Sequence, residues 1–123
     1  MKIMKKISLF LMLVVTLFTF TGCGTKNVEG TLEELMTKVY ADIPEESRPM
    51  MLGNIVVDSE NIEYYLGTKD IDYKEALASE SGVGSIAHSV VLVRLNDGAD
   101  TEKVMKAIKE KVDPRKWICV GVE

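Results

Sequence analysis

The sequence is poor in the side chains from which catalytic and metal sites are most often built. Its 123 residues include one histidine, His88, and two cysteines, Cys23 and Cys119. A zinc site needs a cluster of Cys and His ligands, and such a cluster is absent from the sequence. A nucleophile-elbow motif and a complete phosphate-binding glycine loop are also missing. We therefore expect no catalytic residue, no metal ion and no cofactor.

Basic residues are scarce in most of the chain. Lys2, Lys5 and Lys6 precede Cys23, whereas all 19 acidic residues follow it. From Cys23 onward, 12 basic residues face 19 acidic ones, which gives a net charge of about −7 at neutral pH. A surface of this sign is repelled by nucleic-acid phosphates and by anionic lipid head groups. Nucleic acid is thus excluded as a partner, and attachment to a membrane through a basic patch is disfavoured.

The first 22 residues have the three parts of an export signal. The three lysines form a positive start, residues 7–20 are an uncharged apolar run, and small residues follow at positions 21–24. This order is typical of a secretory signal peptide. An uncleaved membrane-spanning helix is the alternative, but a span needs about 20 apolar residues and this run is shorter. We predict that residues 1–22 are removed as a signal peptide.

The cysteine at the end of this segment indicates how the mature chain is held. Phe20-Thr21-Gly22-Cys23 resembles the lipobox of bacterial lipoproteins, although leucine is the usual residue where Phe20 stands. The resemblance implies that the Cys23 thiol is lipidated and that the chain is cleaved before it. Two or more acyl chains anchor a protein stably. We expect residues 23–30 to be the lipidated cysteine and a tether, on the extracytoplasmic face of the cell membrane. Plain secretion with a chance cysteine is the alternative.

Residues 31–123 are long enough for one small domain. Thr31 and Glu34 form a capping box, and apolar residues at helical spacing continue to about Asp42. Further along the chain we expect a loop over residues 44–49, a short strand over 55–57, a short helix over 59–66 closed by Gly67, a helical turn over 73–79 and a break at 81–84.

The strongest pattern lies in the last third of the chain. Residues 86–95 contain a run of β-branched residues that is typical of an interior strand covered on both faces. His88 and Arg94 fall at opposite ends of one face. Asn96-Asp97-Gly98 predicts a turn, after which Asp100 or Thr101 caps a helix that continues to about Val112.

Residues 117–122 are again apolar and strand-like. A strand, a helix and a strand in this order predict a β-α-β unit over residues 86–122. The fold class we predict is α+β, a small β-sheet with helices packed against it.

Several residues have weak chemical interpretations. Ser85 and His88 resemble a serine–base pair, but residues three apart on a strand point to opposite faces. Residues 82–84, Gly-Val-Gly, lack the remaining glycine of a phosphate loop, and Asp70 and Asp72 lack the later ligands of a calcium loop. We expect a structural histidine, a linker and surface acids. Cys119 lies in an apolar run and is expected to be a buried, unreactive thiol.

Four features of the chain carry a resemblance: the lipobox, the capped helix, Ile71-Asp72-Tyr73, and residues 86–98 followed by an amphipathic helix. In these features the chain is similar to a family of short lipoproteins from Gram-positive, clostridia-like bacteria. That family is described only as a domain of unknown function, so the resemblance implies no site residues. The hypothesis is a membrane-anchored lipoprotein whose small extracytoplasmic accessory or binding domain has an unknown ligand. A docking or inhibitory module for another envelope protein is the alternative, and an extracytoplasmic enzyme is a third possibility that the missing motifs disfavour.

Overall fold

The computed structural model describes residues 28–116. Within them the elements in chain order are α2 (Leu32–Ala41), the 3-10 turn η2 (Glu45–Ser47), β1 (Leu52–Val57), α3 (Ile62–Leu66), β2 (Tyr73–Ser81), β3 (Ser89–Leu95), α4 (Thr101–Lys111) and the 3-10 turn η3 (Pro114–Lys116). The predicted signal peptide, Cys23 and the strand predicted over residues 117–122 lie outside the described residues.

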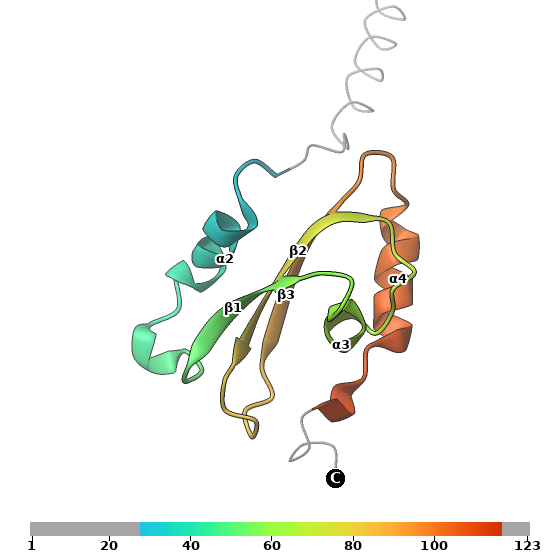
Figure 1. Ribbon diagram of the computed structural model, residues 1–123. Helices are drawn as coiled ribbons and strands as arrows, with labels where there is room; N and C mark the ends of the chain where they lie inside the picture. Colours follow the sequence, from blue (N-terminus) through green and yellow to red (C-terminus); the bar gives the residue numbers. More distant parts are fainter. Residues whose placement is uncertain (1–27, 117–123) are drawn as a thin grey trace, which may run out of the picture.

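The three strands form one antiparallel sheet in the order β1-β2-β3 (Figure 1). β2 is central, with Ala78 paired to Ile55 of β1 on one side and to Val91 of β3 on the other. Helices pack against this sheet, so the predicted α+β class is confirmed.

The helical turn predicted over residues 73–79 is wrong, because this segment belongs to the central strand. Alanine, leucine, lysine and glutamate favour helices when the chain is considered locally. In the folded protein, however, Leu77 and Ala78 are both almost fully buried, one on each face of the sheet. A strand that is covered on both faces shows no alternation of polar and apolar residues. Pairing with two neighbouring strands therefore overrides the local helix propensity.

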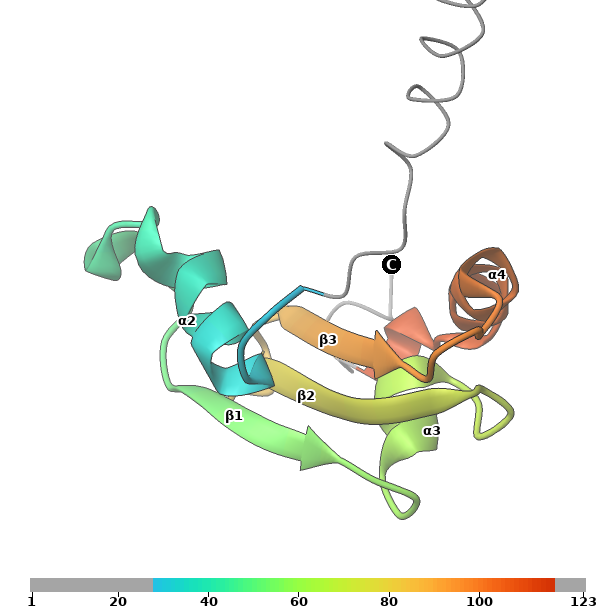
Figure 2. The same ribbon diagram turned by 90° about the horizontal axis from the view of Figure 1, so that it is seen from above.

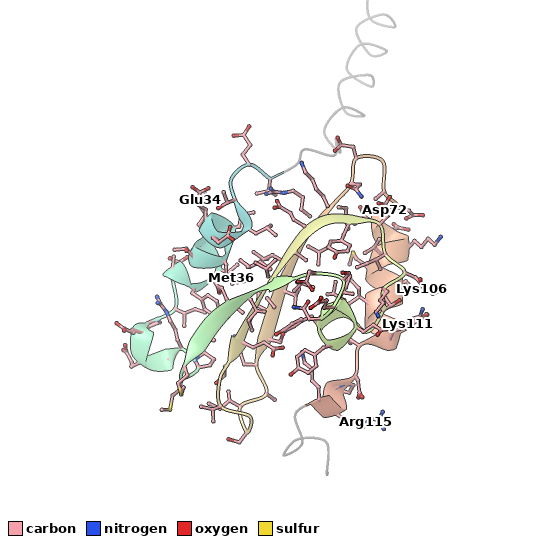
Figure 3. The ribbon with its side chains drawn as sticks, in the orientation of Figure 1. Glu34, Met36, Asp72, Lys106, Lys111 and Arg115 are labelled. Carbon is pink, nitrogen blue, oxygen red and sulfur yellow. The ribbon has the colours of Figure 1, made fainter. Side chains whose placement is uncertain are left out.

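Each face of the sheet has its own apolar core. On one face α2 places Leu32, Met36 and Tyr40 against Leu77 (Figures 2 and 3). On the other face, α3 and the strands form a cluster that includes Ile62, Tyr65, Leu66, Ala76 and Ala78, with Ile108 of α4 packed against it. The two clusters together fix which helix covers which face.

The caps predicted from the sequence set the ends of the helices. Thr31 Oγ1 accepts a hydrogen bond from the Glu34 amide at 3.2 Å, and Glu34 Oε2 accepts one from the Thr31 amide at 3.0 Å. Gly67 ends α3 in the left-handed conformation at φ 76°, as predicted. Of the two candidates for the cap of α4, Asp100 fills the role, since its carboxylate accepts from the Lys103 amide.

β3 is shorter than predicted and begins at Ser89, because the His88 amide donates to the Ile86 carbonyl in a turn. Helices cover both of its faces, as predicted: Val90 packs toward α2, and Val91 packs toward the α3 cluster. Within residues 28–116 it nevertheless lies at an edge of the sheet, not in the interior. β3 and α4 supply the first two parts of the predicted β-α-β unit, and the third part lies outside the described residues.

Candidate functional site

His88 is held by a helix and does not pair with Ser85. Its Nε2 lies 2.8 Å from the hydroxyl of Tyr40, a residue of α2. Ser85 is exposed in the turn before β3. Arg94 was predicted at the other end of the strand face that carries His88. Its guanidinium donates to the Glu75 carboxylate and to the carbonyls of Val28 and Gly30. Both polar side chains thus join the sheet to neighbouring segments.

The remaining weak candidates are parts of turns. Asp72 accepts a hydrogen bond from the Asn96 side chain near the start of α4, and the Asp70 amide donates to Thr68 Oγ1 (Figure 3). Residues 82–84 belong to the connection between β2 and β3, where the Gly82 amide donates to the Met51 carbonyl. In residues 28–116 no group of three or more His, Cys, Asp or Glu side chains could hold a metal ion.

A buried ion pair that the sequence does not reveal lies on the α3 face. The Lys116 ammonium is 2.5 Å from Glu80 Oε1, and the two side chains are only 7% and 9% exposed. The same ammonium lies 4.5 Å from the ring centroid of Tyr64 and 5.1 Å from that of Tyr65. Charges removed from water in this way are tolerated only when they are paired. The cluster therefore fixes the position of the chain at residue 116.

Burial and the nearby charge in this cluster change the pKa of its two tyrosine hydroxyls. Burial raises the pKa of the Tyr64 and Tyr65 hydroxyls above the ordinary value of 10, and the negative charge of Glu80 raises both further.

Ser89 lies opposite Glu80 in the register of the sheet. Its hydroxyl oxygen is buried without a hydrogen-bond partner among the described residues. A buried polar atom of this kind costs free energy unless a further donor reaches it.

Several large apolar side chains are exposed on and beside the edge strand β1. Met50 and Met51, in the turn that leads into this strand, are 69% and 71% exposed. Val39, Ile43 and Val56 of the same part of the chain are exposed as well. We call the segment from Val39 to Val56 the methionine edge. Isolated exposed apolar residues are ordinary, but two adjacent methionines that are both about 70% exposed in one turn indicate a candidate contact surface.

The backbone at Met51 strengthens this interpretation. Met51 is the only non-glycine residue with a positive φ, 54°, among those described. A side chain in the left-handed region costs about 1–2 kcal/mol. Such strain is typical of positions that are kept for function. The end of β2 stabilises this turn, since the Ser81 hydroxyl donates to the Met50 carbonyl at 2.6 Å.

Cys23, the predicted lipidation site, and Cys119, the expected buried thiol, both lie outside the described residues. No helix within residues 28–116 is long and apolar enough to cross a membrane. Comparison with protein-family models, with curated proteins and with solved structures finds no match to this chain.

Proposed function

We propose that the protein is a lipoprotein, held at the extracytoplasmic face of the cell membrane by lipid on Cys23, whose domain binds another protein of the envelope. The basic start, the apolar run and the lipobox-like Phe20-Thr21-Gly22-Cys23 support the anchor. The exposed Met50–Met51 turn supports the binding role, and it is the single observation that favours docking over the binding of a small ligand.

The methionine edge also defines the chemistry of the partner. Methionine is unbranched and polarisable, so it adapts to an apolar groove. Glu45 and Glu46 of η2 are exposed in the same segment. The complementary surface is thus an apolar groove with a basic rim, on a protein that is itself at the membrane.

The anchor is tested by changing Cys23→Ser. This variant keeps the positive start and the apolar run, so export still begins, but a serine hydroxyl does not replace the thiolate as lipid acceptor. We expect the parent protein to partition into detergent with a mass that shows lipid on a chain beginning at residue 23. The variant should stay as an unprocessed precursor or be released. A parent protein that retains Met1 would indicate an uncleaved span, and one cut without added lipid would indicate secretion.

Docking is tested with a photo-cross-linking amino acid in place of Met51 in the membrane-bound protein. Met105 of α4 offers a matched control, because it is also a methionine and is 64% exposed. We expect one defined cross-linked species from position 51 and none of the same mass from position 105. Met50→Glu, which adds charge to an apolar contact, should reduce the cross-link several-fold. Equal cross-linking from both positions would contradict docking through the methionine edge.

A further inference from the structure

The outer edge of β3 borders a largely apolar trough that no element in residues 28–116 fills. The trough has a volume of about 730 Å³, which lies within the range of about 300–1,000 Å³ that is usual for ligand pockets. Leu32 and Leu35 of α2 line one wall, and Leu92 and Val93 of β3 line the floor. The turn after β3 and Thr101 at the start of α4 close one end. Figure 2 shows β3 as the strand farthest from β1.

The backbone along this trough is suited to another strand. Among the described residues β3 pairs only with β2, so the amides and carbonyls of its other side have no strand opposite them. Proteins usually protect such edges with charged residues or proline. Between Ser89 and Val93, however, β3 carries Val90, Val91 and Leu92 and no charge.

The buried ion pair brings the chain to the beginning of this edge. Lys116 is bound to Glu80, and Glu80 pairs in register with Ser89, the first residue of β3. The next residue along the chain therefore starts near Ser89. The Ser89 hydroxyl, which has no hydrogen-bond partner among residues 28–116, lies at the same point, so an added segment here can supply one.

We propose that residues 117–122 bind along the outer edge of β3 as a fourth strand, parallel to β3, and that the Lys116–Glu80 pair sets their register. The segment Trp117-Ile118-Cys119-Val120-Gly121-Val122 is uncharged and apolar, as the trough requires. Residues 117–122 are six residues, one fewer than β3, and six extended residues span about 20 Å. The connection through α4 is a β-α-β crossover, which joins parallel strands and is right-handed in nearly all proteins.

A cross-link from Cys119 tests the position of this segment in the full-length anchored protein. Cys119 is three residues beyond Lys116, so it should lie beside the residue about three beyond Ser89. We therefore introduce Val91→Cys, Leu92→Cys or Val93→Cys one at a time and treat the protein with dibromobimane, a short reagent that bridges two thiols. Because Cys119 is expected to react slowly in the folded state, the treatment is continued until mass spectrometry shows that Cys119 has reacted. A control cysteine replaces Ile55 on β1, the opposite edge of the sheet.

We expect an intramolecular bridge between Cys119 and at least one β3 position, identified by mass spectrometry of the joined peptides, and at least tenfold less bridging to position 55. Failure at all three β3 positions would overturn the proposal, as would equal bridging to position 55. Bridges only between two molecules would show instead that a second copy fills the edge. None of these outcomes depends on docking through the methionine edge.

The role of the ion pair is tested by Glu80→Gln, which leaves Lys116 without its negative partner. Bridging from Cys119 should then fall several-fold, and the amides of residues 89–95 should exchange their hydrogens faster. Glu63→Gln is the matched control, because the carboxylate of Glu63 pairs with Lys69 at an exposed site on α3. Unchanged bridging in Glu80→Gln, or an equal loss in Glu63→Gln, would overturn the assigned role of Lys116 and Glu80.

Discussion

Gly67 lies where the end of α3 approaches the end of α4, and no other residue type fits there. A Cβ at this position would be 2.2 Å from the carbonyl carbon of Lys111, and the backbone has φ +76°. We expect Gly67→Ala to lower the free energy of unfolding by at least about 2 kcal/mol, because strain and overlap add.

Gly84 provides the control for this prediction. A Cβ at Gly84 meets no atom within 4 Å, so Gly84→Ala should change stability by less than about 0.5 kcal/mol. Urea unfolding of residues 31–123, followed by circular dichroism, measures both variants. Equal stability of the two would contradict the close approach of α3 and α4.

Tyr64 and Tyr65 make the fold sensitive to alkaline pH. Burial and then the charge of Glu80 raise the pKa of both hydroxyls above 10. Above pH 10 the unfolded chain therefore releases protons that the folded chain still holds, and the free energy of unfolding falls as the pH rises. Below pH 10 both states hold these protons, and their contribution is constant.

The urea midpoint should accordingly fall as the pH is raised from about 9 to about 11. In the double variant Tyr64→Phe and Tyr65→Phe these protons are missing from both states, so the midpoint should fall less over the same range. A double variant with the same pH profile as the parent would show that the two tyrosines do not cause the loss.

At the scale of elements, local signals in the sequence were enough to predict where a helix or strand ends, wherever a cap or a turn defines that end. Thr31 with Glu34, Gly67 and the Asn96-Asp97-Gly98 turn are all found as predicted. β2 was missed because its strand conformation depends on pairing with β1 and β3, which no local pattern reveals. The Glu80–Lys116 pair joins residues 36 positions apart, and neither side chain has a distinctive sequence neighbourhood.

The cap of α4 gives a sharp prediction, because the sequence offered two adjacent candidates. Asp100 accepts the hydrogen bond from the Lys103 amide at 3.1 Å, whereas Thr101 is already the first residue of the helix. Asp100→Ala should therefore cost about 1 kcal/mol of stability. Thr101→Ala should cost less than about 0.5 kcal/mol. Urea unfolding distinguishes them, and the reverse order would assign the cap to Thr101.

At the scale of the whole molecule, two apolar cores on a three-stranded sheet predict a domain that is stable without its anchor. Residues 31–123 contain both clusters and all three strands. We expect this part to be monomeric and to unfold in a single cooperative thermal transition. A broad transition would contradict independent folding.

In the folded state a thiol reagent should modify Cys119 slowly, and urea should accelerate the reaction.

The proposed anchor also predicts how the domain is oriented. Seven residues separate Cys23 from Thr31, and they can reach at most about 25 Å. Arg94 and Lys74 lie beside Val28–Gly30, where the described chain begins. Gly84 lies in the connection at the far end of β2 and β3, which Figure 1 shows at the opposite end of the sheet. The end with Lys74 should therefore lie closer to the membrane.

This orientation can be measured by energy transfer from a dye on the protein to an acceptor on the lipid head groups. The dye is attached to Lys74→Cys or to Gly84→Cys, each in a Cys119→Ala background, since both positions are exposed. Seven strand residues span about 23 Å, so transfer from position 74 should clearly exceed transfer from position 84. Stronger transfer from position 84 would place the β2–β3 connection at the membrane. The Met50–Met51 turn, which Ser81 and Gly82 hold near that connection, would then be a membrane contact and not a surface for another protein.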